Sequence, residues 1–188
     1  AEGISHNFHY LDSFAGRVQE PQLTQPRLTV ECVHGNPTWS YLWRELLALA
    51  PGDVRVIAID QLGMGYSDRL TERRTLAQRV SDLVEFVGAL EVDTPIVSIA
   101  HDWGGPISLG WVEHCIATRS QVIAGVILLN TAVHQPEVFK GPGLIRLARA
   151  RALLAPVTQY TPIFVRGTTA LSGRKIPRPV AKAFALPY

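Results

Sequence analysis

The sequence has few of the residues that stabilise small secreted proteins or form metal clusters. Its 188 residues include only two cysteines and one methionine. Cys32 lies in a strand-like run and Cys115 in a helix-like run, so their spacing provides neither a disulfide framework nor a metal-binding cluster. We therefore predict two buried free thiols and a reducing, cytoplasmic compartment.

Long apolar runs are also absent. No stretch approaches the roughly 20 apolar residues that a membrane-spanning helix needs, and the first ten residues lack the charged-then-apolar order of a signal peptide. With 47% hydrophobic and 18% charged residues, the composition is not that of a disordered chain. These properties predict a soluble protein with one globular core of ordinary size.

Acidic residues are missing from the C-terminal part. Residues 1–137 contain 9 basic and all 16 acidic residues, a net charge of −7, whereas residues 138–188 contain 9 basic residues and no acidic one. This change predicts a domain boundary between residues 137 and 138. The basic segment fits either a solvated helical lid or a surface for an anionic partner.

Short apolar runs alternate with segments of helical periodicity. Thr75 and Gln78 have the spacing of a capping box, and Pro51-Gly52 ends the preceding helical pattern. Residues 8–12 and 17–20 flank a turn and are candidates for a hairpin. Further strands are expected at residues 28–33, 54–59, 95–100 and 122–129, and helices at 39–50, 75–90 and 104–118. This order predicts an α/β fold with a mostly parallel sheet covered by helices on both faces.

Chemistry in such a fold is expected where the parallel strands end. Asp102 follows a predicted strand, with Ala100 before it and Gly104 and Gly105 after it. Small residues at these three positions permit a tight strand-to-helix turn that exposes one side chain, the geometry of a nucleophile elbow. The helix N-terminus would also keep Asp102 ionised. The alternative is an ordinary Asp at a helix N-cap.

Three segments that follow predicted strands together resemble the α/β-hydrolase fold in its haloalkane dehalogenase and epoxide hydrolase branch. They are His34-Gly35-Asn36-Pro37-Thr38-Trp39, residues 60–69, and His101-Asp102-Trp103-Gly104-Gly105. The resemblance covers about residues 8–137. It implies that residues 1–137 are the N-terminal part of the hydrolase core and that residues 138–188 begin a helical cap. Asn36 favours the dehalogenase side, because epoxide hydrolases commonly have an aromatic residue there.

A carboxylate that attacks an acyl group gives a reactive anhydride, so the better target for Asp102 is an electrophilic sp³ carbon. The departing anion then needs hydrogen-bond donors, for which Asn36 and the indole N–H of Trp103 are candidates. The resemblance implies that both match the halide-stabilising positions of the dehalogenases. Two alternatives are open: Asn36 could form an Asx-type turn before Pro37, and Trp103 could pack in the core.

Neither His34 nor His101 is expected to be the catalytic base. His34 begins a structural turn, and strand alternation directs His101 to the side opposite Asp102. The family has its base histidine near the C-terminus, whereas all six histidines of this sequence precede residue 135 and no acid follows Glu137. We therefore expect a fragment of a longer protein, with the base, its orienting acid and the C-terminal part of the fold beyond Tyr188.

Residues 129–136, 146–164 and 178–188 resemble the β-lactone decarboxylases of bacterial olefin biosynthesis. This resemblance implies a β-lactone with two long alkyl chains, which Asp102 opens with loss of carbon dioxide or bicarbonate to leave an alkene. It also implies a fused or associated β-lactone synthetase as a partner. The alternatives are a haloalkane dehalogenase, an epoxide hydrolase, and a catalytically silent domain used for binding.

No cofactor is predicted. Residues 60–65 lack the spacing of a dinucleotide-binding fingerprint, and no His/Cys cluster has the spacing of a zinc site. The expected ligand is a small apolar substrate, with no nucleic acid and no transmembrane segment. The choice between lactone, haloalkane and epoxide, and the oligomeric state, are left open by the sequence.

Overall fold

A computed structural model describes residues 5–15, 25–70, 72–133, 161–171 and 176–188. Contacts within the chain define two units, residues 1–132 and residues 133–188. The expected boundary between residues 137 and 138 lies outside the described residues, so the two predicted domains stay a prediction.

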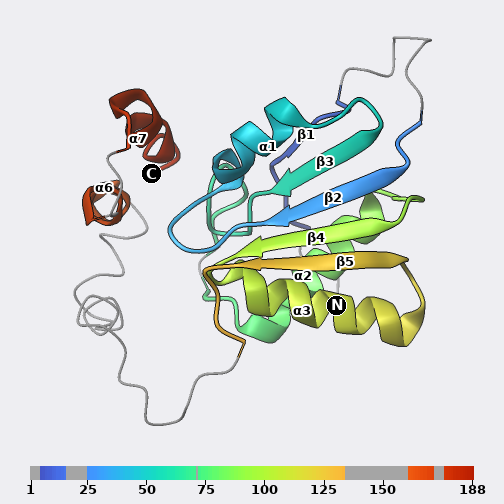
Figure 1. Cartoon of the computed structure of the whole chain (residues 1–188). Coiled ribbons are helices and arrows are strands. Elements are labelled where there is room, and N and C mark those ends of the chain that lie inside the picture. The colour runs from blue at the N-terminus through green and yellow to red at the C-terminus, as the bar shows by residue number, and fades with distance from the viewer. Residues whose placement is uncertain (1–4, 16–24, 71, 134–160, 172–175) are drawn as a thin grey trace. The chain divides into compact units, whose positions relative to one another are not determined.

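The described part of the first unit forms a five-stranded sheet with the strand order β1-β3-β2-β4-β5 (Figure 1). β1 is antiparallel to β3, and the other neighbouring strands are parallel. The strands are β1 (Tyr10–Asp12), β2 (Leu28–Val33), β3 (Val54–Ile59), β4 (Ile96–His101) and β5 (Ile123–Leu129). The prediction of an α/β fold with a mostly parallel sheet is therefore confirmed.

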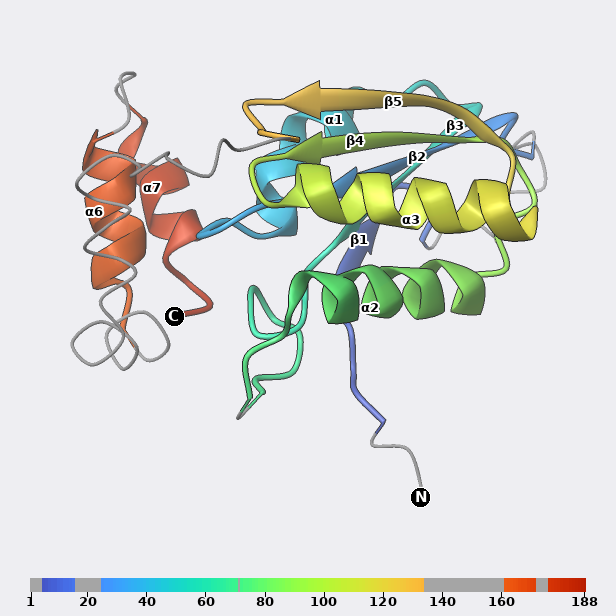
Figure 2. The same cartoon turned by 90° about the horizontal axis from the view of Figure 1, so that it is seen from below.

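Helices cover both faces of this sheet. α2 (Leu76–Ala89) and α3 (Gly104–Thr118) lie side by side along one face, and α1 (Arg44–Leu49) covers part of the other (Figures 1 and 2). Alternating residues of each strand supply the two apolar layers. In β3, for example, Ile57 and Ile59 belong to the layer under α2 and α3, whereas Val56 and Ala58 belong to the layer under α1.

The helix predicted at residues 39–50 is instead two shorter elements. A 3₁₀ turn, η2 (Ser40–Trp43), precedes α1, and Trp43 between them has a ψ of 7°, outside the α-helical range. α2 begins with the expected capping box, in which the Thr75 hydroxyl accepts from the Gln78 N–H while the Gln78 side chain accepts from the Thr75 N–H. α3 has the predicted bounds.

The two outer strands differ from expectation. β1 pairs with β3 by long-range contacts, and residues 17–20, its candidate hairpin partner, lie outside the described residues. β5 lies within the apolar run 122–129 that was expected as a strand of a sheet covered on both faces, yet Ile127 is 46% exposed and Leu129 is 43% exposed. The reason is that β5 is an edge strand in the described sheet and has β4 as its neighbour on one side.

The second unit is described for two helices, α6 (Ile163–Leu171) and α7 (Arg178–Phe184). Pro177 at the N-cap and Pro179 in the first turn suit the start of α7, where backbone N–H groups have no helical partner. Val165 of α6 and Phe184 of α7 are buried. Among the described residues of the whole chain, no helix has the length and apolar character required to cross a membrane.

Candidate active site

Asp102 occupies a sharp turn between β4 and α3. Its φ of 54° lies in the left-handed region, which Asp tolerates better than most residues. Close packing below this turn leaves no space for side chains at the following glycines. A Cβ atom at Gly104 would lie 2.2 Å from the Val33 carbonyl oxygen, and one at Gly105 would lie 2.1 Å from Thr131 Oγ1. The turn therefore has the strained strand-to-helix geometry of a nucleophile elbow.

The Asp102 carboxylate meets the turn that follows β2. The backbone N–H of Asn36 donates to Asp102 Oδ1 over 2.9 Å. Gly35 permits this approach, since a Cβ atom there would lie 2.3 Å from the same oxygen. Parallel strands β2 and β4 are neighbours, so residues 34–36 and Asp102, which directly follow them, meet at one edge of the sheet.

Thr131 is a residue of this site that the sequence analysis did not select. It follows β5, and its hydroxyl donates to the Asp102 carbonyl oxygen over 2.6 Å. The Asp102 N–H donates to the Leu129 carbonyl oxygen over 3.2 Å. Both ends of the elbow residue are thus fixed by the neighbouring strand, and a position directly after a strand was the signal that could have identified Thr131.

Asn36 lies in the turn after β2, and Trp103 directly follows Asp102. Both side chains are exposed within the described structure, Trp103 by 51%. The alternative that Trp103 packs in the core is therefore wrong. Exposed N–H groups next to Asp102 are available for a ligand, which is what stabilisation of a departing anion would require. The peptide bond from Asn36 to Pro37 is cis.

His34 is fully buried below the turn, and both of its ring nitrogens are engaged. Nε2 accepts from the Gln61 backbone N–H over 3.0 Å, and Nδ1 lies 2.8 Å from the Gly35 carbonyl oxygen. Burial lowers the pKa of His34, which keeps the ring neutral. The ring therefore stabilises the turn, and neither of its nitrogens is free to act as a base.

His101 is the last residue of β4, and Asp102 follows it in the turn. His101 is on the same face of the strand as Ile99, which packs against the apolar layer under α1. Ala100 belongs to the layer under α2 and α3 on the other face. The described structure thus provides no reason to assign His101 to the Asp102 carboxylate.

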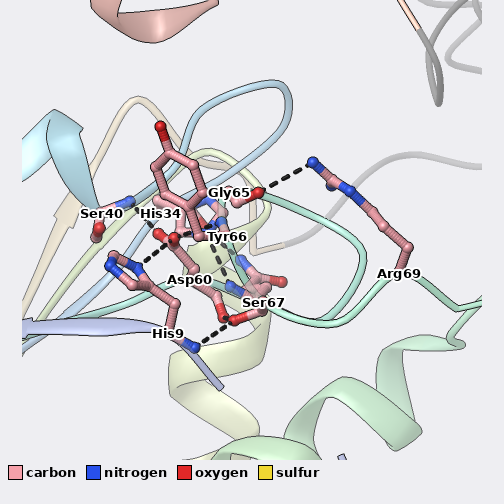
Figure 3. A network of polar contacts seen from close by, with 9 residues as sticks. His9, His34, Ser40, Asp60, Gly65, Tyr66, Ser67 and Arg69 are labelled. Carbon is pink, nitrogen blue, oxygen red and sulfur yellow. Dashed lines mark hydrogen bonds and ion pairs between the residues drawn. The ribbon is translucent and has the colours of Figure 1, made fainter. Parts of the chain in front are cut away.

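Asp60, which follows β3, is fully buried in a separate polar network (Figure 3). Its Oδ2 accepts from His9 Nδ1 over 2.7 Å and from the Tyr66 N–H over 2.9 Å. Its Oδ1 accepts from the Ser40 N–H over 2.6 Å. The Ser67 hydroxyl donates to the Asp60 carbonyl oxygen. Asp60 therefore joins three loops at the same edge of the sheet, and its carboxylate oxygens are occupied by these protein donors.

A second buried carboxyl group lies in the middle of the sheet. Glu31 of β2 is 2% exposed and faces α3, with Ser98 Oγ 2.6 Å from its Oε2 and Ser108 Oγ 2.7 Å from Ser98 Oγ. Burial raises the pKa of Glu31 to about 8, and the Ser98 hydrogen bond opposes that rise only in part. Glu31 is therefore a neutral acid at pH 7.

The described residues contain no group of three His, Cys, Asp or Glu side chains that could hold a metal ion. Both cysteines are free and buried, and burial raises the pKa of each thiol. At the elbow, the Asp102 carboxylate accepts from the Asn36 backbone N–H.

Comparison with protein families matches residues 29–155 to the α/β hydrolase fold, more than half of the chain. The chain therefore belongs to the α/β hydrolase family. Its relatives are enzymes of this superfamily, and their names are consistent with a haloalkane dehalogenase-like α/β hydrolase.

Two relatives illustrate this placement. The chain is 33% identical over 168 residues to a cis-3-alkyl-4-alkyloxetan-2-one decarboxylase of Xanthomonas campestris, with 85% of this chain and 55% of the relative covered. It is 31% identical over 153 residues to haloalkane dehalogenase 2 of Mycobacterium tuberculosis, with 80% and 49% covered. The chain thus spans about half the length of the curated relatives that it matches.

Solved structures agree with the fold. The crystal structure of the haloalkane dehalogenase DatA from Agrobacterium tumefaciens superposes with a TM-score of 0.68 at 19% sequence identity, covering 95% of this chain and 58% of that chain. A putative ancestral haloalkane dehalogenase gives a TM-score of 0.71 at 22% identity, covering 96% and 61%. At these identities the likeness concerns the fold alone.

Proposed function

We propose that Asp102 is the nucleophile of an enzyme that opens a long-chain β-lactone and decarboxylates it to an alkene. The observation that carries this proposal is the elbow itself, in which Asp102 has a φ of 54° and its Oδ1 lies 2.9 Å from the Asn36 N–H. The substrate class is supported by the relative that is named an oxetan-2-one decarboxylase, because an oxetan-2-one is a β-lactone.

The proposed reaction has two steps, and its atoms balance without water. The Asp102 carboxylate attacks the sp³ ring carbon that bears the lactone oxygen, so a new C–O ester bond forms as the ring C–O bond breaks. The lactone carbonyl becomes a free carboxylate. In the second step this carboxylate leaves as carbon dioxide, the bonding electrons form the alkene, and the ester bond to Asp102 breaks and restores its carboxylate.

Donors around Asp102 would stabilise the charges of both steps. The Asn36 side chain and the Trp103 indole would meet the carboxylate that the ring opening releases. The backbone N–H groups of Asn36 and Trp103 would stabilise charge on the Asp102 oxygen. The exposure of both side chains and the 2.9 Å contact of the Asn36 N–H support these roles. Gly35, Pro37, Gly104 and Gly105 would shape the two turns, and His34 would support the first.

Residues 138–188 would begin a helical cap of the hydrolase fold. The base histidine and orienting acid of such an enzyme would belong to the part of the relatives' length that this chain does not span. We further propose a cytoplasmic protein with a fused or associated β-lactone synthetase as its partner. The basic character of residues 138–188 would suit a solvated helical lid in which the stems of arginine side chains lie over apolar surface.

Haloalkane dehalogenase activity is the second candidate function. The relative of that name in Mycobacterium tuberculosis supports it. In this case Asp102 would displace a halide from an sp³ carbon, and water would hydrolyse the ester. Epoxide opening is the third candidate, and a silent binding domain is the non-enzymatic one.

The test supplies a cis-3,4-dialkyl oxetan-2-one and, separately, 1-bromohexane to the protein and to its Asp102→Ala variant. We expect alkene from the lactone, detected by gas chromatography, and no product from either probe with Asp102→Ala. The matched control is Asp93→Ala, which removes an exposed carboxylate before β4 and should keep full activity.

Three outcomes would decide between the candidates. Alkene formation that needs Asp102 supports the decarboxylase, whereas halide release without alkene supports the dehalogenase. An Asp102→Ala variant that retains the activity of the wild type would overturn the nucleophile assignment.

A further inference from the structure

The peptide group between Gly35 and Asn36, which faces Asp102, is hydrogen-bonded through both its N–H and its carbonyl oxygen. Its N–H, from Asn36, donates to Asp102 Oδ1 over 2.9 Å. Its carbonyl oxygen, from Gly35, is approached by three groups: His34 Nδ1 at 2.8 Å, the Thr38 N–H at 3.0 Å and the Thr38 hydroxyl at 3.0 Å. Hydrogen bonds to a carbonyl polarise its peptide group, so this N–H is a stronger donor than an ordinary one.

The His34 contact requires one particular tautomer. Nε2 accepts from the Gln61 backbone N–H at 3.0 Å, which means that the proton of a neutral ring is on Nδ1. Nδ1 then donates to the Gly35 carbonyl oxygen. The ring has no exposed surface, and burial lowers the pKa of His34, so the neutral state is favoured.

Gln61 holds His34 with its side chain as well as its backbone. Its Nε2 donates to the His34 carbonyl oxygen, and its Oε1 accepts from Arg79 Nη1 over 3.1 Å. A guanidinium can only donate, so Arg79 fixes which end of the Gln61 amide faces His34. Arg79 also donates to the Leu62 carbonyl oxygen over 3.3 Å.

Partial burial of the charged Arg79 side chain costs free energy, which an uncharged residue at this position of the helix would not. Its position on α2 is half-buried, and burial lowers its pKa. An apolar side chain would fill the same space without desolvating a charge. The Arg79 guanidinium donates to residues 61 and 62, which lie in the loop after β3. The charge is therefore used to hold this loop.

We propose that Gln61 and Arg79 are positioning residues for the second chemical step at Asp102. Neither touches the carboxylate. Their side chains hold the His34 carbonyl oxygen and the loop whose Gln61 backbone N–H sets the His34 tautomer. Through His34 and Gly35 they keep the Asn36 N–H strongly polarised and directed at Asp102 Oδ1. This inference rests on the proposed nucleophile.

We expect slower ester breakdown but nearly unchanged ester formation, because negative charge moves in opposite directions in these two steps. During ester formation, negative charge leaves the Asp102 oxygens for the departing group. During ester breakdown, charge returns to them, by release of the carboxylate in the lactone route or by attack of water in the haloalkane route. A donor at Oδ1 stabilises developing charge, so it accelerates breakdown specifically.

The experiment measures ester formation and breakdown separately, by rapid quench and intact-mass spectrometry, with a cis-3,4-dialkyl oxetan-2-one; 1-bromohexane measures ester formation alone. Gln61→Met and Arg79→Met should slow ester breakdown about tenfold, less than the 10²–10³-fold typical of deleting a donor outright. Ester formation should change less than twofold, so the Asp102 ester accumulates. Arg79→Lys, which retains a charged donor, should recover most of the breakdown rate.

Arg55→Met is the matched control. Arg55 is a partly buried arginine of β3 that pairs with Asp12 over 2.8 Å, away from the elbow. Its loss should lower stability without changing the ratio of the two rates. Equal slowing of both steps in Arg79→Met, or a normal ratio in both Arg79→Met and Arg79→Lys, would overturn the inference. Wild-type protein that forms no Asp102 ester would instead overturn the proposed function.

Discussion

Glu31 is a carboxyl group inside an apolar layer, and its protonation state determines what it contributes to stability. It is 2% exposed, and its Oε1 has no hydrogen-bond partner within the described residues. Its pKa of about 8 in the folded state lies above the ordinary value of 4.5. Between these values the folded chain retains a proton that the unfolded chain has lost.

The free energy of unfolding should therefore fall as the pH rises from about 4.5 to about 8, by up to about 1.4 kcal/mol per pH unit from Glu31 alone. Above pH 8 this contribution no longer changes. Glu31→Gln keeps the size of the side chain without the titration. Urea unfolding at pH 5 to 8 should show a shallower pH dependence for Glu31→Gln than for the wild type, and identical slopes would contradict the raised pKa.

Position 104 requires glycine because a side chain would collide with neighbouring backbone, and not because of its φ angle. Gly104→Ala would place a Cβ atom 2.2 Å from the Val33 carbonyl oxygen, so the elbow would have to move. We expect a loss of about 1–3 kcal/mol of stability together with most of the activity. Gly88→Ala is the control: nothing lies within 4 Å of its Cβ position in α2, and it should stabilise by up to about 1 kcal/mol. Chemical denaturation of both variants measures the difference, and an unaffected Gly104→Ala would count against a tightly packed elbow.

Among the elements, those set by local patterns were predicted well. The bounds of β2, β3 and α3 are those expected, because each is a short apolar run or a periodic segment bordered by turn residues. Contacts between distant segments were not predictable in this way. β1 pairs with β3 some 45 residues later, and the break at Trp43 occurs where the Ser40 N–H is held by Asp60.

The residues of the candidate site show the same contrast between local sequence patterns and contacts of distant segments. Asp102 and Asn36 were selected from the sequence because each lies in a distinctive motif just after a predicted strand, and the structure brings the Asn36 N–H to Asp102 Oδ1. Thr131, Gln61 and Arg79 were not selected, since their partners lie 29, 27 and 18 residues away in the sequence and no local pattern records such pairs. Their role follows only from the strand order that brings these loops to one edge of the sheet.

The capping box of α2 gives a prediction for a single element. Thr75→Ala removes the hydroxyl that accepts from the Gln78 N–H over 3.2 Å, and should lower stability by about 1 kcal/mol. Ser81→Ala, at an exposed interior position of the same helix, should leave stability unchanged or slightly higher. Thermal unfolding of the two variants compares them. A Thr75→Ala protein as stable as Ser81→Ala would show that the cap does not contribute.

At the scale of the whole molecule, the two proposed reactions differ in what the 188-residue chain can complete. Haloalkane turnover needs an activated water to hydrolyse the ester, and His34 has both ring nitrogens engaged. We expect 1-bromohexane to leave one stable hexyl group on Asp102. A β-lactone should instead turn over repeatedly, because loss of carbon dioxide restores the carboxylate.

Intact-mass spectrometry with peptide mapping checks this expectation, and Asp102→Ala should show no adduct. Sustained halide release by the 188-residue chain would contradict it and would return His101 or His134 to consideration as the base. An adduct on a residue other than Asp102 would contradict the nucleophile assignment.

The strand order also bears on how the protein can fold while it is being synthesised. β1 is made first but has no neighbour until β3 is made; β3 then pairs with both β2 and β1, β4 joins the free side of β2, and β5 joins β4. β4 and β5 are therefore added at an outer edge, and no strand has to be inserted between two strands that are already paired. The nascent chain can build this sheet outward from β2 as it leaves the ribosome, and the elbow at Asp102 is completed once Thr131 has emerged.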